Sequence, residues 1–82
     1  MSTGYEITFS DFCLLLSYPD HRPHVAPLIS RWFDCEIAPT DDGFVLRDSR
    51  GVEVSPQTVH EAIQADHDRQ YSIYQTAMSL WR

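Results

Sequence analysis

The spacing of apolar residues changes after Asp34, and this change constrains the fold of the 82-residue chain more than any other feature. After Asp34, two short β-prone pieces are joined by a turn from Asp48 to Gly51. They predict a β-hairpin over residues 44–54, which must pack on helices because an isolated hairpin is unstable in water. Before Asp34, apolar residues follow the spacing of one helical face: Val25, Leu28, Ile29, Trp32 and Phe33.

The hairpin is separated from the preceding helix by a short connection. Residues 35–38 (Cys-Glu-Ile-Ala) are compatible with a brief strand, whereas residues 39–43 (Pro-Thr-Asp-Asp-Gly) have the chemistry of a turn. An earlier helix is predicted from Thr8, which with Asp11 has the form of a capping box, to the residue before Pro19.

Two more helices are predicted after the hairpin. Ser55 and Pro56 are an N-cap followed by proline at the first helical position. Asp66 can cap a last helix over residues 67–81. The order is therefore α-α-β-β-α-α, and we predict a small single α+β domain over residues 1–82. It is mostly helical, with one β-hairpin packed on the helices.

The charge balance argues against a nucleic-acid partner. The chain has 12 acidic and 6 basic residues, a net charge of −6, which repels DNA and RNA. The alternative is a winged-helix-like DNA-binding regulator, with Arg47 and Arg50 on the wing and Arg31 on the helix before it. That arrangement normally has three helices before the hairpin, whereas this sequence predicts two.

We expect a cytoplasmic protein with no membrane partner. The longest apolar run, residues 12–16, is far too short to span a bilayer, and no lysine or arginine precedes Arg22 as in a signal peptide. Without signs of export, Cys13 and Cys35 are expected to be free thiols.

The candidate metal ligands are His21, His24, Cys35, His60 and His67. Two pairs of these histidines, three and seven residues apart, have spacings that could share a helical face. The chain lacks the close ligand spacings of Cys-x-x-Cys or His-Glu-x-x-His sites. We therefore expect ordinary histidines and no metal or cofactor. A small metal-binding module is the alternative.

Motifs for catalysis are missing from the sequence. No serine is flanked by glycines, and the three glycines form no phosphate-binding loop. Asp41 and Asp42 precede Gly43 and are most simply part of a turn. We expect that the protein is not an enzyme.

The last predicted helix carries a wide apolar arc. On a helical wheel its apolar residues cover about 180°, whereas a helix on the surface of a monomer needs little more than about 100°. The middle of the arc can serve the core, which leaves Tyr71 and Met78 on a surplus flank. The alternative is that the whole arc is wedged between other elements. The arc consists of Leu80, Ile73, Ala77, Trp81, Tyr74, Met78 and Tyr71.

This flank is the sequence's main indication of function, because Tyr, Trp and Met are enriched at the centres of protein interfaces. We hypothesise a small acidic, non-enzymatic interaction protein, an accessory or regulatory factor. It would bind a protein partner or a second copy of itself through the last helix, and the simplest form is a homodimer. The candidate partner-binding residues are Tyr71, Tyr74, Met78 and Trp81.

Overall fold

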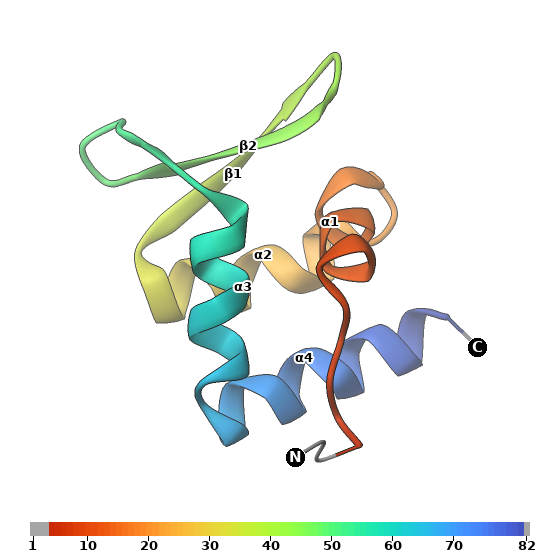
Figure 1. Cartoon of the computed structure of the whole chain (residues 1–82). Coiled ribbons are helices and arrows are strands. Elements are labelled where there is room, and N and C mark those ends of the chain that lie inside the picture. Colours follow the sequence, from red (N-terminus) through yellow and green to blue (C-terminus); the bar gives the residue numbers. More distant parts are fainter. Residues whose placement is uncertain (1–3, 82) are drawn as a thin grey trace.

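The computed structural model describes residues 4–81, which form four α-helices and one three-stranded antiparallel sheet. In Figure 1 the sheet lies at one end of the molecule, and the β1–β2 hairpin extends beyond the helices. This is the predicted α+β fold, mostly helical, and its elements follow the predicted order with one strand added. Its elements are α1 (Phe9–Ser17), α2 (Arg22–Phe33), β1 (Cys35–Thr40), β2 (Gly43–Asp48), β3 (Glu53–Val54), α3 (Pro56–Gln64) and α4 (His67–Leu80).

The sheet has three strands instead of the predicted single hairpin. The hairpin over 44–54 is present as β2 and β3, but β1 pairs along the whole of β2, from Cys35 opposite Asp48 to Thr40 opposite Gly43. The predicted turn over residues 39–43 is thus confined to Asp41 and Asp42. Proline is tolerated at position 39 because β1 is an edge strand, where a missing donor need not interrupt the ladder.

Local signals set the ends of α1. The hydroxyl of Thr8 accepts a hydrogen bond from the Asp11 N–H at 3.1 Å, so the predicted cap is confirmed. The helix stops at Ser17, before Tyr18 and Pro19. The guanidinium of Arg22 then donates to the Leu16 and Ser17 carbonyl oxygens, each at 2.7 Å, and satisfies acceptors that the helix end leaves open.

The break before the last helix is also confirmed. Asp66 has extended backbone, and its carboxylate accepts hydrogen bonds from the Asp68 and Arg69 N–H groups at 3.0 and 3.3 Å. This N-cap begins α4 at the predicted residue, His67. Among residues 4–81, no helix is long and apolar enough to cross a membrane.

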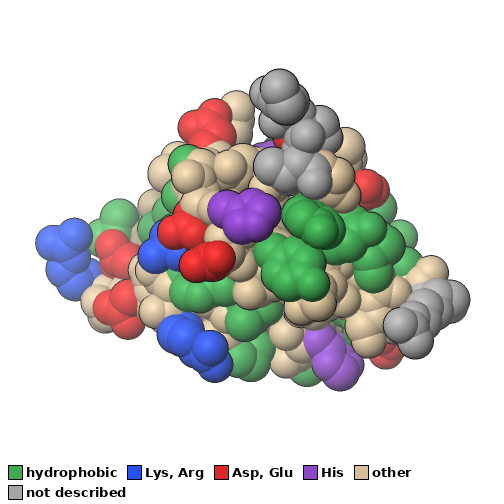
Figure 2. Space-filling model, turned by 90° about the horizontal axis from the view of Figure 1, so that it is seen from below, with side chains coloured by type: hydrophobic (Ala, Val, Ile, Leu, Met, Phe, Trp, Pro, Cys, Tyr) green, Lys and Arg blue, Asp and Glu red, His purple; other side chains and the backbone are tan. Residues whose placement is uncertain are grey.

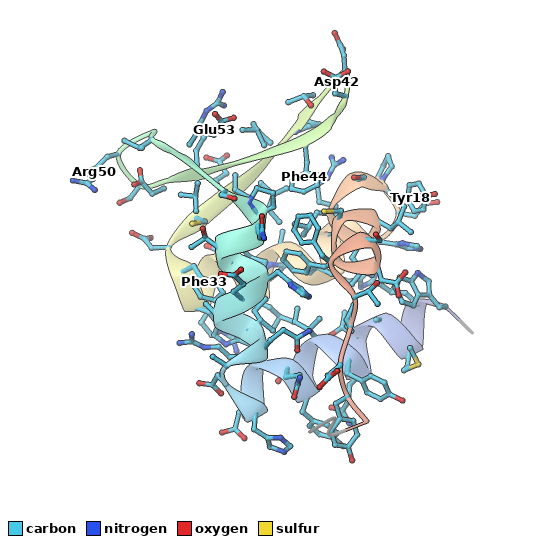
Figure 3. All side chains as sticks on the ribbon, viewed as in Figure 1. Tyr18, Phe33, Asp42, Phe44, Arg50 and Glu53 are labelled. Carbon is cyan, nitrogen blue, oxygen red and sulfur yellow. The ribbon has the colours of Figure 1, made fainter. Side chains whose placement is uncertain are left out.

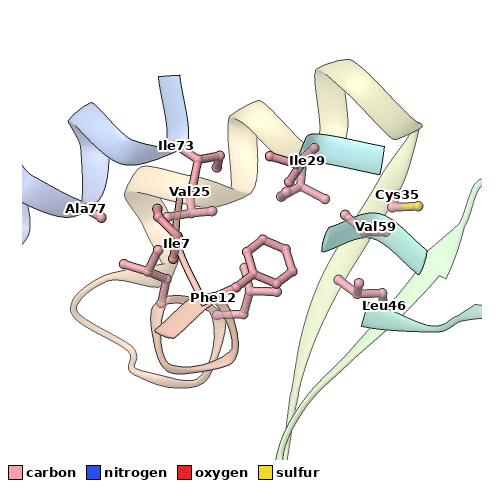
Figure 4. Packing of buried hydrophobic residues seen from close by; sticks show 12 residues of the cluster. Ile7, Phe12, Val25, Ile29, Cys35, Leu46, Val59, Ile73 and Ala77 are labelled. Carbon is pink, nitrogen blue, oxygen red and sulfur yellow. The ribbon is translucent and has the colours of Figure 1, made fainter. Parts of the chain in front are cut away.

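One apolar cluster joins all four helices to the sheet, and Figure 4 shows Phe12 near its centre. The helix α4 packs on α2 and α3 and contributes Ile73 and Ala77 to the cluster. The core therefore fixes which side of α4 faces inward. The buried apolar residues are Ile7, Phe12, Leu15, Leu16, Val25, Ile29, Cys35, Leu46, Val59, Ile63, Ile73 and Ala77.

Candidate protein-interaction surface

The apolar arc of α4 is divided between the core and the surface. Ile73 and Ala77 are buried and Tyr74 is half-buried. Tyr71, Met78 and Trp81 remain 39%, 40% and 37% exposed. The structure thus confirms the surplus flank at Tyr71 and Met78. It also places Trp81, which the wheel assigned to the middle of the arc, at the exposed C-terminal end of the helix.

We call Tyr71, Tyr74, Met78 and Trp81 the α4 face. They lie at i, i+3, i+7 and i+10, so they form a row about 15 Å long at 1.5 Å per residue. Residues 70–81 contain no charged side chain, in a chain whose net charge is −6. Figure 2, which views the molecule from below, shows hydrophobic side chains gathered to the right of the centre, with no acidic or basic side chain inside the group.

Aromatic contacts extend the surface beyond α4 at its C-terminal end. The ring of Trp81 packs edge-on against His21, with centroids 6.4 Å apart, and His21 packs in the same way on Tyr18 at 5.5 Å. The Tyr18 side chain points away from the body of the molecule in Figure 3 and is itself exposed. The link between α1 and α2 therefore continues the apolar surface.

Residues 4–7, the N-terminal lead, meet the other end of the α4 face. The ring of Tyr5 packs edge-on against Tyr71 and Tyr74, with centroid distances of 4.8 and 5.1 Å, and against His67 at 6.1 Å. Sequence reasoning missed Tyr5, because its contacts are with residues more than 60 positions away. Its position two residues before the apolar Ile7 gives no local signal of them.

A partly buried polar network lies beneath the lead. His60 Nε2 and Gln64 Nε2 both donate to the Ile7 carbonyl oxygen, at 2.7 and 2.8 Å. Gln70, which is 5% exposed, donates from its amide to the side-chain oxygen of Gln64. Gln70 lies within the apolar arc of α4, so the helix turns a polar residue inward while Tyr71, its neighbour, lies outside.

On the flank of α4 opposite the α4 face, an arginine packs on two aromatic rings of α2. The guanidinium carbon of Arg69 lies 5.0 Å from the centre of the Phe33 ring and 5.9 Å from that of Trp32. Its Nε is 3.8 Å from the Asp66 carboxylate, which caps the same helix. These contacts on the polar flank hold α4 in place without using the α4 face.

The candidate metal ligands have separate surroundings. His60 binds the Ile7 carbonyl, His21 lies between Tyr18 and Trp81, and His67 packs on Tyr5. Cys35 is buried, and burial together with the nearby Asp48 and Asp34 carboxylates raises the pKa of its thiol. Within the part of the chain that the structure describes, no three His, Cys, Asp or Glu residues are grouped so as to hold a metal ion.

Carboxylates lie beside two of the arginines that the winged-helix alternative requires. Arg47 on β2 has Glu36 on one neighbouring strand and Glu53 on the other. Arg50, which points away from the molecule in Figure 3, is 3.8 Å from the Asp48 carboxylate. The described residues place two helices, α1 and α2, before the sheet.

Asp48 stabilises the turn between β2 and β3. Its carboxylate accepts hydrogen bonds from the Val52 and Arg50 N–H groups at 3.0 and 2.9 Å. The bond from Val52 is the main cause that holds the pKa of Asp48 below its usual value. Burial acts in the opposite direction, and the Arg50 N–H bond and the Arg50 charge add to the lowering. Gly51 completes the turn with a φ of +82°, which glycine adopts without strain.

We compared the chain with family models, curated proteins and solved structures, and none of the three comparisons gives a match.

Proposed function

We propose that this chain is a small, acidic, non-enzymatic interaction protein of the cytoplasm, which docks through the α4 face and in its simplest form is a homodimer. One observation carries the proposal. Tyr71, Met78 and Trp81 stay exposed on an uncharged side of α4 while the fold buries Ile73 and Ala77 from the same helix. Aromatic and methionine side chains in such a row are typical of interface centres.

The absence of charge favours a second copy as the occupant. A basic partner would be recognised by acidic residues, and the α4 face has none. Two chains of net charge −6 repel each other, so their contact has to form where neither presents a charge. An antiparallel pairing of two α4 helices about a twofold axis would bring Tyr71 of one copy beside Trp81 of the other.

The test is the solution mass of the untagged protein, measured by light scattering across a wide concentration range. We expect a monomer–dimer equilibrium that Met78→Glu and Tyr71→Glu abolish, because each places a charge on the apolar row. The matched control is Val52→Glu, since Val52 is an exposed apolar residue on the β2–β3 turn, remote in sequence from α4. If neither α4 variant changes the mass or any co-purifying partner while the fold persists, the proposal is wrong.

Salt gives a second measurement of the same equilibrium. Added salt screens the repulsion between two acidic chains, so self-association through an uncharged face should stay constant or strengthen. Binding to nucleic-acid phosphates would weaken instead. Retention on duplex DNA that falls with salt and with Arg47→Ala would favour the winged-helix alternative.

A further inference from the structure

The ring of Tyr5 lies in the layer that a partner of the α4 face would occupy. Its centroid is 4.8 Å from that of Tyr71 and 5.1 Å from that of Tyr74, and both contacts are edge-on. Packed helices have axes about 8–10 Å apart, with their side chains interleaved between them. A helix packed along the whole α4 face would therefore need the space beside Tyr71 and Tyr74 that Tyr5 fills.

The lead is fixed to the fold from Ile7 onward. Ile7 is buried, and its carbonyl oxygen accepts hydrogen bonds from His60 and Gln64. Thr8 then caps α1. Glu6 is exposed, so the link between Tyr5 and the anchored Ile7 runs through solvent. Once the contacts of Tyr5 itself are broken, rotation about this link can carry its ring off α4, while the hydrogen bonds at Ile7 stay in place.

We propose that Tyr5 is an intramolecular cover of the α4 face, which a second copy of this chain displaces in order to pack along the full row. This inference rests on the proposed function, because it needs a docking partner at that face. Tyr5 packs on Tyr71 and Tyr74, although Tyr71 keeps 39% of its surface exposed, and none of the ring contacts of Tyr5 described above is with Met78 or Trp81. The first contact between two copies therefore forms at the Met78 end, and the departure of Tyr5 completes it.

A covered face binds more weakly than an open one, because only the fraction of molecules with Tyr5 displaced is competent to form the full interface. Tyr5→Ser removes the ring and keeps the backbone of the lead. We expect the dimer of this variant to have a dissociation constant lower by about tenfold, since the contacts of the Tyr5 ring no longer have to be broken. The measurement is sedimentation equilibrium of wild-type and variant protein.

Two further variants make the comparison specific. Val52→Ser is the control for loss of an exposed apolar side chain at another place, and it should leave the dissociation constant unchanged. Met78→Glu, introduced together with Tyr5→Ser, should return the protein to a monomer, because the tighter dimer still uses the α4 face. Thermal melting of each variant establishes that the core is intact before its mass is interpreted.

The outcomes separate this inference from the proposed function. If the protein is a monomer in every variant, both are overturned. If it dimerises in a Met78-dependent way but Tyr5→Ser leaves the dimer unchanged or weakens it, the cover alone is overturned, and Tyr5 is part of the interface or idle. Tighter, Met78-dependent association of the Tyr5→Ser variant supports both.

Nuclear magnetic resonance tests the displacement directly in the unmodified chain. Nuclear Overhauser contacts between the rings of Tyr5 and Tyr71 are expected in dilute, monomeric protein and should disappear at concentrations where the dimer dominates. Contacts within one chain that persist in the dimer would overturn the cover. An isotope-filtered experiment on a mixture of labelled and unlabelled chains distinguishes them from contacts between copies.

Discussion

The inward side of α4 buries one polar residue beside its apolar ones, whereas the outward side exposes large apolar side chains. The inward side includes Gln70, which is nearly inaccessible to solvent, whereas the α4 face exposes Tyr71, Met78 and Trp81. Gln70 can be buried because its amide hydrogen-bonds to Gln64, which in turn donates to the Ile7 carbonyl oxygen. The comparison teaches that hydrogen bonding, as well as hydrophobicity, decides which residues of this helix are buried. The exposed residues are then available for a contact outside the fold.

The largest expected effect is a difference in the free energy of unfolding between substitutions on the two sides of α4. Ile73→Ala removes a buried side chain from the core and should lower the free energy of unfolding by about 2–5 kcal/mol. Met78→Ala changes an exposed position and should alter it by about 0.5 kcal/mol or less. Urea denaturation at a concentration where the protein is monomeric measures both. Equal losses would mean that the α4 face belongs to the core.

A middle-sized effect is expected at the buried glutamine. Gln70→Leu keeps the volume but removes the donor to the half-buried Gln64, and a desolvated acceptor left without its donor costs about 1–3 kcal/mol. Gln75→Leu is the matched control, because Gln75 is a glutamine of the same helix whose amide donates to the Tyr71 hydroxyl at the exposed surface. A Gln70→Leu protein as stable as the wild type would show that hydrogen bonding does not control which side of α4 is buried.

The smallest effect should come from the flank that faces α2. Arg69→Ala removes a guanidinium from the Trp32 and Phe33 rings, and the loss should be about 1 kcal/mol at this partly exposed site. Arg50→Ala, in the β2–β3 turn, should have little effect, since its ion pair is at the surface. If Arg69→Ala also changed the dimer equilibrium, the assignment of docking to the α4 face and of packing on α2 to the Arg69 flank would be wrong.

The parts of the fold predicted from sequence are those set by neighbouring residues. The caps at Thr8 and Asp66 and the stop before Pro19 act within a few positions, and the structure has all three. The sequence predicts a strand over residues 35–38 that is shorter than β1, because residues 39–43 have turn composition. Pairing with β2 extends it to Thr40, and this pairing depends on the tertiary position of an edge strand.

The candidate surface was predicted only in part for the same reason. Exposure of Tyr71 and Met78 follows from helical period, which is local. The packing of Tyr5 on α4 and the hydrogen bond between Gln64 and Gln70 each join segments that are separate in the sequence. No periodicity in the sequence therefore indicates them. Whether a partner covers the face stays a prediction.

The network beneath the lead also contributes to the angle at which α4 is turned about its own axis. An apolar arc of about 180° can be buried at more than one angle, and a helix held by hydrophobic contacts alone could turn about its axis to cover Met78 or Tyr71. The bond from Gln70 to Gln64 adds a directional constraint to the burial of Ile73 and Ala77, because even a modest rotation would carry the amide away from its acceptor. A polar contact on the inside thus helps to keep the aromatic row on the outside, and the orientation of any partner on α4 is set from within the core.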